Sequence, residues 1–157
     1  MTRLRGRAQR GRRLHAKAPC GRWQSTTMLS SIRLDGTTAC MTIAGATDTE
    51  VFRNYVQWVL VPTLRRGDIV VMDNLGAHKS PATLALIEAV GAEAWFLPAY
   101  SPDLNPIEKM WSKIKGLLRS AEARTPEELD QAIGSALTKV TPNDARGWFA
   151  SCGYSII

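Results

Sequence analysis

The chain has 157 residues, 45% of them hydrophobic and 22% charged, and this size and balance are typical of one globular domain with its own core. No run of about 18 apolar residues occurs, and no apolar segment follows the basic N-terminus, which excludes a membrane span and disfavours a secretory signal. The isolated cysteines Cys20, Cys40 and Cys152 lack zinc-site spacing and favour reduced thiols in a cytoplasmic protein.

The positive charge is concentrated in residues 1–22, the basic N-terminal segment. This segment holds eight Lys or Arg and no acid, whereas residues 23–157 hold 12 basic and 14 acidic residues, so the net charge of +6 comes from the segment alone. Such a block binds a phosphate backbone because each neutralised phosphate releases counterions. A solvated arm or a transit peptide is the alternative interpretation. The residues predicted to contact DNA here are Arg3, Arg5, Arg7, Arg10, Arg12 and Arg13.

The first elements in chain order form a predicted β-hairpin. β-branched and apolar residues over 23–34 indicate a strand, and Asp35-Gly36 is a strong turn sequence. Residues 38–44 then read as the returning strand. We therefore expect Asp35 to be a turn residue and not a metal ligand.

A helix and a buried strand are predicted next. Thr47 and Glu50 have the spacing of a capping box, and the helix behind them is expected to end near Pro62. Residues 69–72 form a continuous apolar run, which is typical of a strand buried on both faces. This run stops abruptly at Asp73.

The second half of the chain continues the alternation of helices and strands. The pattern predicts a helix over residues 80–91, a second buried strand over 92–98, a helix after Asn105 and another that includes residues 129–140. The tail, residues 148–154, is expected to pack back on the body. Strands that alternate with helices predict a mixed α/β sheet covered on both faces.

The start of the helix after Asn105 has an ordinary local explanation. Asn is a favoured N-cap, Pro106 suits the first helical position, and Glu108 stands where a capping box needs an acid. Thr125 and Glu128 repeat the same offsets further along the chain. The local pattern alone therefore predicts that Glu108 is a capping residue.

Asp73 gives Glu108 a second interpretation. In open α/β sheets ligands bind beyond the carboxyl ends of the strands, where Asp73 is placed, although an Asx-type turn also explains an Asp there. The next strand returns to the same edge and leads into the helix that carries Glu108. Two carboxylates that converge from separate elements are what a hard divalent cation needs.

The residues around both acids resemble a known family. "VVMDNLGAHKS" followed by "FLPAYSPDLNPIEKMWSKIK", with 34 residues between Asp73 and Glu108, resembles the second and third acids of a DDE transposase of the mariner superfamily, in its bacterial insertion-sequence branch. The resemblance implies an RNase H-like core that cleaves and joins DNA with two Mg²⁺ or Mn²⁺ ions held by three carboxylates. It also implies that Asp73 and Glu108 are catalytic metal ligands. The implied partners are transposon ends and target DNA, with a homodimer for the intact enzyme and a cytoplasmic, nucleoid-associated location.

Other positions of the motif have two interpretations each. Asn74, His78 and Asn105 are expected to support the metal-binding loop, and ordinary surface residues of a helix entry are the alternative. His78 is disfavoured as a direct ligand because Mg²⁺ prefers oxygen. Three lysines, Lys79, Lys109 and Lys113, are further candidates for DNA contact, although a charged helix face is usually only solvated.

The sequence departs from the family at its first acid. In the family the first catalytic Asp lies on the central strand, before the basic stretch. In this chain no acid precedes Asp35, and neither Asp48 nor Asp68 lies at the position of that first Asp. We therefore expect residues 23–157 to form the C-terminal part of an RNase H-like mixed sheet flanked by helices. This core would be N-terminally truncated, with the first central strand missing and an unpaired gap. The chain alone is expected not to cleave DNA, and a non-catalytic nucleic-acid-binding module that uses residues 1–22 is the alternative.

Overall fold

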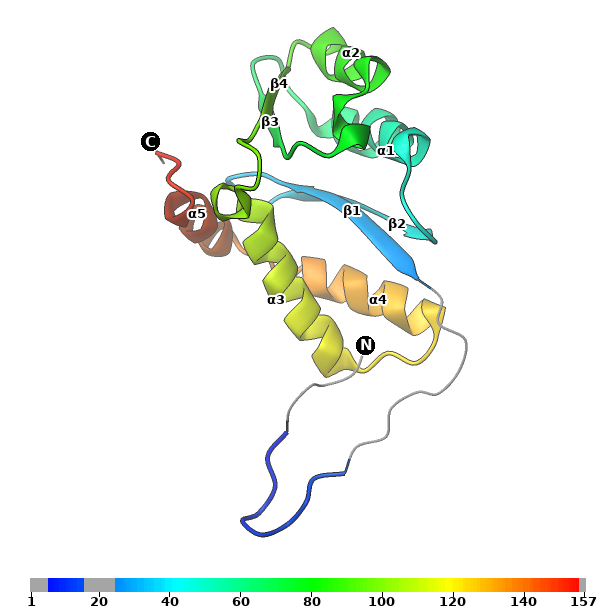
Figure 1. Cartoon of the computed structure of the whole chain (residues 1–157), viewed down its shortest axis with the longest axis vertical. Helices are drawn as coiled ribbons and strands as arrows, with labels where there is room; N and C mark the ends of the chain where they lie inside the picture. The colour runs from blue at the N-terminus through cyan, green and yellow to red at the C-terminus, as the bar shows by residue number, and fades with distance from the viewer. Residues whose placement is uncertain (1–5, 16–24, 156–157) are drawn as a thin grey trace.

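The computed structural model describes residues 6–15 and 25–155, and its elements alternate between short strands and helices (Figure 1). The predicted DNA contacts at Arg3 and Arg5 lie outside the described residues. In chain order the elements are β1 (Thr26–Ile32), β2 (Thr38–Ala44), α1 (Thr49–Tyr55), the π-helix η1 (Val56–Leu60), the 3₁₀ turn η2 (Val61–Thr63), β3 (Ile69–Met72), η3 (Gly76–Lys79), α2 (Pro81–Ala89), β4 (Glu93–Phe96), η4 (Pro102–Leu104), α3 (Pro106–Ala121), α4 (Pro126–Leu137) and α5 (Pro142–Ser151).

The predicted hairpin is confirmed. β1 and β2 pair antiparallel from Thr26 opposite Ala44 to Ile32 opposite Thr38. The Asp35 carboxylate accepts a hydrogen bond of 2.8 Å from the Thr37 amide, and Gly36 has a φ of 86°, which suits glycine in a tight turn. Asp35 is therefore a turn residue, as the Asp-Gly sequence predicts.

The second sheet is a parallel pair, β3 and β4, with Ile69 opposite Glu93 and Met72 opposite Phe96. The expected single mixed sheet is thus divided, within the described residues, into two sheets of two strands each. The prediction that both parallel strands are buried on both faces is wrong, because Ile69 is 48% exposed and Trp95 is 55% exposed. An apolar run implies burial only where neighbours cover both faces, and here helices cover one.

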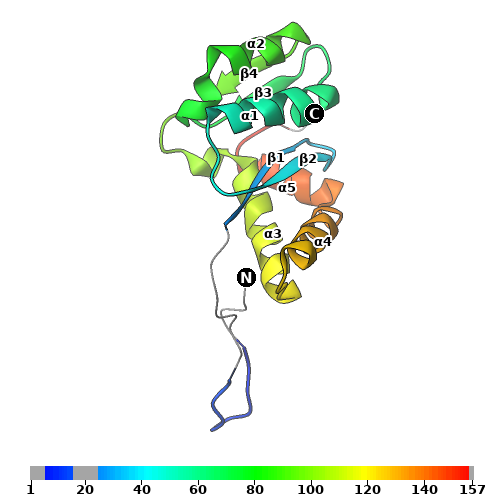
Figure 2. The same cartoon turned by 90° about the vertical axis from the view of Figure 1, so that its right-hand side faces the viewer.

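Two hydrophobic clusters hold these sheets. One surrounds α1, η1 and α2 and includes residues of both sheets, such as Leu29 and Val70. Within this layer the Tyr55 hydroxyl donates a hydrogen bond of 3.0 Å to the Ala39 carbonyl, and burial raises the pKa of that hydroxyl. The second cluster joins α3 and α4 to the opposite face of β1, through Met28 and Ile32. The hairpin therefore lies between the two helical layers, as both views show (Figure 1 and Figure 2).

The structure corrects the predicted cap of α1 and confirms that of α4. Thr47 was the predicted cap of α1, but the cap is Asp48, whose carboxylate accepts a hydrogen bond of 2.8 Å from the Val51 amide. A carboxylate is favoured there over a neutral hydroxyl because it also faces the positive end of the helix dipole. The capping box of Thr125 and Glu128 at α4 is confirmed.

The C-terminal tail contains a helix that the sequence reading missed. α5 begins with a capping box in which Thr141 and Asp144 bond each other's backbone amides. The Thr-Pro-Asn-Asp pattern is typical of a helix start, although the sequence analysis did not predict a helix here. Beyond α5, the Tyr154 hydroxyl donates a hydrogen bond of 3.0 Å to the Leu104 carbonyl in η4. The tail therefore packs back on the body, as predicted, beside the segment that leads into α3.

Candidate metal site in the cleft between the sheets

A cleft of about 400 Å³ separates β1 from β3. Side chains of α1 line one side of it, with Phe52 and Tyr55, and the first turns of α3 line another, with Ile107 and Trp111. Four residues predicted from the sequence to form or support the metal site lie along this single cleft: Asp73, His78, Asn105 and Glu108.

Asp73 is the first residue after β3, and its side chain is 57% exposed. One carboxylate oxygen, Oδ1, accepts a hydrogen bond of 3.0 Å from the Leu75 amide, which is the Asx-type turn expected for an Asp at this place. The other oxygen, Oδ2, has no partner among the described residues. The turn thus fixes the direction of the carboxylate and leaves one oxygen free for a ligand.

His78 supports the same carboxylate. Its Nδ1 atom lies 2.7 Å from Asp73 Oδ1, at ion-pair distance but without the alignment of a hydrogen bond. The imidazole also packs on the Phe52 ring, with 4.3 Å between ring centroids, so the histidine is fixed between α1 and the acid. Next to Asp73, the Asn74 side-chain amide donates a hydrogen bond to the Leu97 carbonyl and ties the loop to the end of β4.

Glu108 lies in the first turn of α3 but does not act as a cap. The Asn105 side chain makes no capping bond, and the Glu108 carboxylate has no hydrogen bond or ion pair within the described part of the chain. In contrast, Glu128 at the same offset in α4 accepts bonds from the Thr125 and Arg124 amides. The capping prediction is therefore wrong for Glu108. Its side chain is exposed and lines the cleft, and its carboxylate stabilises no other group of the described residues.

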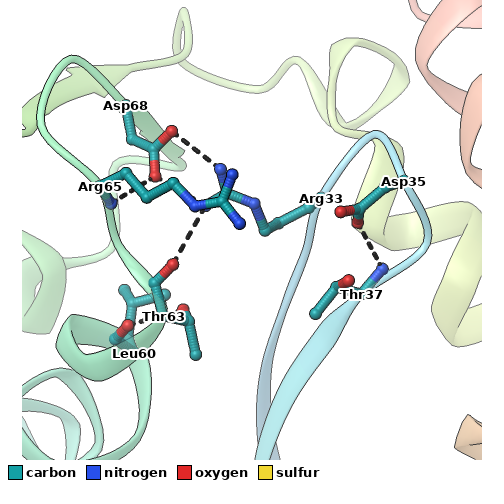
Figure 3. Close-up of polar contacts among 7 residues, drawn as sticks. All are labelled: Arg33, Asp35, Thr37, Leu60, Thr63, Arg65 and Asp68. Atoms are coloured by element: carbon teal, nitrogen blue, oxygen red, sulfur yellow. Dashed lines mark hydrogen bonds and ion pairs between the residues drawn. The ribbon is translucent and has the colours of Figure 1, made fainter.

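The donor set suits a hard cation but is incomplete. Carboxylate oxygens are the ligands that Mg²⁺ and Mn²⁺ prefer, and three carboxylates line the cleft, those of Asp68, Asp73 and Glu108. Residues 6–15 and 25–155 contain no group of three Asp, Glu, His or Cys side chains that would hold a metal. Asp68, at the other end of β3, is engaged by the Arg33 guanidinium through two hydrogen bonds of 2.7 and 2.8 Å (Figure 3).

The predicted DNA-contacting residues are distributed over several surfaces. Lys79 lies with Nζ 5.7 Å from the centroid of the Phe96 ring, a cation–π distance. Lys113 donates hydrogen bonds to the Lys139 carbonyl and to Asp144, at 2.7 and 2.5 Å, so its ammonium group already has a structural use. Lys109 is half-buried. The arginines of the basic segment that the structure describes are exposed: Arg7, Arg10, Arg12 and Arg13.

A mixed α/β domain with one acid at the carboxyl end of a parallel strand and another on the helix that follows the neighbouring strand is the class of fold on which divalent-metal phosphoryl-transfer sites are built. The family model for DDE superfamily endonucleases matches residues 1–130, and the chain belongs to this family. Its mixed α/β fold is consistent with the RNase H-like domain of these enzymes, for which DNA is the substrate and divalent metals are typical.

The comparison with curated proteins gave no match. Within residues 6–15 and 25–155, no helix has the length and apolar character needed to cross a bilayer.

Proposed function

We propose that the chain is part of the catalytic domain of a mariner-superfamily transposase of the bacterial insertion-sequence branch. Its place of action is DNA in the bacterial cytoplasm. The observation that carries this proposal is the unused Glu108 carboxylate, which lines the same cleft as the oriented Asp73. An acid that neither caps its helix nor pairs with a base is available as a ligand.

Asp73 and Glu108 are the proposed cation ligands, and the residues around them have supporting tasks. The Leu75 amide bonds Asp73 Oδ1 and His78 lies against the same oxygen, so Oδ2 would be the atom that holds the cation. Asn74 holds the loop at Leu97, so the acid and the end of β4 keep their relative position. When bound, divalent cations at such a site activate water or a DNA 3′-hydroxyl and stabilise the leaving oxygen at phosphorus.

Two carboxylates support weak cation binding and no turnover. A two-metal site needs oxygen ligands for both ions, and Asp73 and Glu108 supply only part of that set. We therefore infer that the chain alone does not cleave DNA. DNA contact is assigned to the arginines of residues 1–22 with Lys79 and Lys109. For Lys113, contact with DNA would require the loss of its bond to Asp144.

Manganese binding tests this function, because Mn²⁺ can be followed by electron paramagnetic resonance. Asp73→Asn and Glu108→Gln are each expected to weaken Mn²⁺ binding about tenfold, since each removes one of two charged ligands. Asp103→Asn is the matched control, because Asp103 lies in η4, directly before the helix that carries Glu108, and is exposed but does not line the cleft. Equal Mn²⁺ affinity in all four proteins refutes the site. Mg²⁺-dependent nicking by the purified chain, lost in Asp73→Asn, refutes the inferred inactivity.

The second candidate is a non-catalytic nucleic-acid-binding module, favoured by the charge of residues 1–22. Its eight basic residues without an acid predict DNA binding that weakens as salt increases. Deletion of residues 1–22 is then expected to abolish DNA binding, while Glu108→Gln leaves it unchanged. If Mn²⁺ also stabilises the DNA complex through Glu108, the module interpretation fails and the transposase proposal gains support.

A further inference from the structure

β4 has one edge that pairs with β3 and one edge that is free. Within the described residues β4 pairs with no other strand. The Glu93 and Leu97 amides bond carbonyls at the two ends of the β3 segment, at 2.9 and 2.8 Å. Backbone groups alternate between the two edges of a strand, so the N–H and C=O groups of Ala94 and Phe96 point to the free edge.

The groups on either side of this short edge are not available for pairing. The Ala92 amide, directly before β4, already bonds a carbonyl of α2 at 3.3 Å. Pro98, beyond the end of the strand, has no amide. A partner strand at this edge therefore pairs with Ala94 and Phe96. No Lys or Arg lies between Ala92 and Pro98, so the edge lacks the basic side chains by which native sheets often block such pairing.

An apolar face continues the free edge. Val70 and Ala94 pack against the α1 layer, so the residues that alternate with them lie on the opposite face of the strand pair. On that face Ile69 is 48% exposed and Trp95 is 55% exposed. The Trp95 indole N–H donates a hydrogen bond of 3.0 Å to the Glu93 carboxylate, which fixes the ring beside the edge. A fixed, exposed Trp next to unpaired backbone groups is typical of a surface that receives a partner.

A second copy of the chain fits this edge because the edge is complementary to itself. In an antiparallel pair centred on Trp95, Ala94 stands opposite Phe96 of the partner subunit, and Phe96 stands opposite the partner's Ala94. Each of these residues then donates and accepts one hydrogen bond. The neighbouring symmetric registers, centred on Ala94 or Phe96, bring Ala92 or Pro98 into the bonding positions, where neither has a free amide.

The side chains suit the same register. The two Trp95 residues meet at the symmetry axis as a non-hydrogen-bonded pair, with Cα atoms about 4.5 Å apart, so their exposed rings cover each other. The two Glu93 carboxylates stand four residues apart along the strands, or about 13 Å, which keeps the like charges separate. On the other face the small Ala94 side chain lies opposite the large Phe96 ring. A symmetric pair of identical strands thus satisfies backbone, charge and side-chain volume together.

We propose that the free edge of β4 is an interface at which two copies of the chain join their parallel strand pairs into one sheet. The strand order of that sheet is β3-β4-β4-β3, with the two β4 strands antiparallel and Trp95 on the axis. The interface uses neither Asp73 nor Glu108, so this inference stands or falls independently of the metal site.

Sedimentation equilibrium of the full chain tests the dimer. The average mass is expected to rise toward twice that of one chain as the protein concentration increases through the micromolar range. Trp95→Lys places two like charges at the axis and is expected to weaken the dimer by about tenfold or more. Trp58→Lys is the matched control, since Trp58 is a 70% exposed Trp of η1, and this variant is expected to dimerise like the wild type.

A charge pair keeps the test independent of folding. Trp95→Glu is expected to be monomeric like Trp95→Lys, because it also places two like charges at the axis. A mixture of the two variants is expected to form dimers again, since opposite charges then face each other across the axis. Variants that had lost their fold would not associate on mixing. A mixture that stays monomeric therefore counts against the assigned register.

Hydrogen exchange followed by nuclear magnetic resonance identifies the edge. The Ala94 and Phe96 amides are expected to exchange about tenfold more slowly in concentrated than in dilute protein, while the α4 amides stay unchanged. A wild-type chain that remains monomeric overturns the interface, and so does a Trp95→Lys dimer as stable as the wild type. Concentration-dependent protection of β1 or β2 in place of β4 assigns the contact to the other sheet and likewise overturns the proposal.

Discussion

The ion pair of Arg33 and Asp68 is the polar link between the hairpin and β3, and its removal is the clearest test of how the cleft is held. The guanidinium bonds both Asp68 oxygens and, at 3.4 Å, the Thr63 carbonyl, while the Arg65 amide bonds Asp68 Oδ2 at 2.8 Å (Figure 3). Asp68→Asn keeps the size of the side chain but removes its charge. Arg33 then remains at the sheet junction without an anion.

The stability expected to be lost in Asp68→Asn follows from the lowered pKa of Asp68. The hydrogen bonds from Arg33, with a further bond from the Arg65 amide, lower the pKa of Asp68 from 3.8 to about 2. A decrease of this size corresponds to about 2.5 kcal/mol between the two protonation states. The side chains of Arg33 and Asp68 are 29% and 21% exposed, so solvent screening reduces the expected contribution to about 1–2 kcal/mol.

The pH dependence has a definite sign. Because the folded pKa of Asp68 lies below its ordinary value, its stabilising contribution is present above pH 3.8 and is lost as the pH falls to about 2. Lys113 and Thr141 also lower the pKa of Asp144 to about 2, so the stabilising contribution of Asp144 is lost in the same pH range. Asp144 is present in both proteins, so the difference between wild type and Asp68→Asn isolates Asp68.

Urea unfolding at several pH values measures this difference. Asp68→Asn is expected to unfold about 1–2 kcal/mol more easily at pH 7, and roughly 3–6 °C lower on heating, with a difference that vanishes near pH 2. Asp103→Asn, an exposed acid in η4, is expected to match wild type throughout. A deficit in Asp68→Asn that is as large at pH 2 as at pH 7 refutes the assignment to the ion pair.

The remaining predictions concern helix starts. Glu128→Ala is expected to lower the free energy of unfolding by about 0.5–1 kcal/mol, because it removes half of a capping box. Glu108→Ala is expected to change this free energy by no more than about 0.5 kcal/mol, and equal losses for the two variants in urea unfolding would show that Glu108 is a cap. Lys113→Met is expected to cost about 1 kcal/mol at pH 7 and less near pH 2, where Asp144 is protonated and only the bond to the Lys139 carbonyl is still lost. A pH-independent loss in the same assay would contradict that pairing.

Local patterns predicted local structure well in this chain. The Asp35-Gly36 turn fixed the register of the hairpin, because a tight turn leaves the flanking strands one way to pair. Thr125 and Glu128 formed the expected box because both partners lie within one helical turn. The position of Asp73 at the end of β3 followed from the apolar run that precedes it.

Properties set by distant neighbours were harder to predict. Glu108 has the same offset from its cap as Glu128, yet only Glu128 caps. The cap residue is Asn105 in α3 and Thr125 in α4, and the capping box is a pattern of Ser or Thr caps, so the shared offset of the acid does not by itself predict capping. The exposure of Ile69 and Trp95 depends on which faces of β3 and β4 receive a helix, which an apolar run does not specify. The division into two sheets likewise depends on how β1 and β3 lie on the two sides of the cleft, and the sequence of a single segment does not specify it.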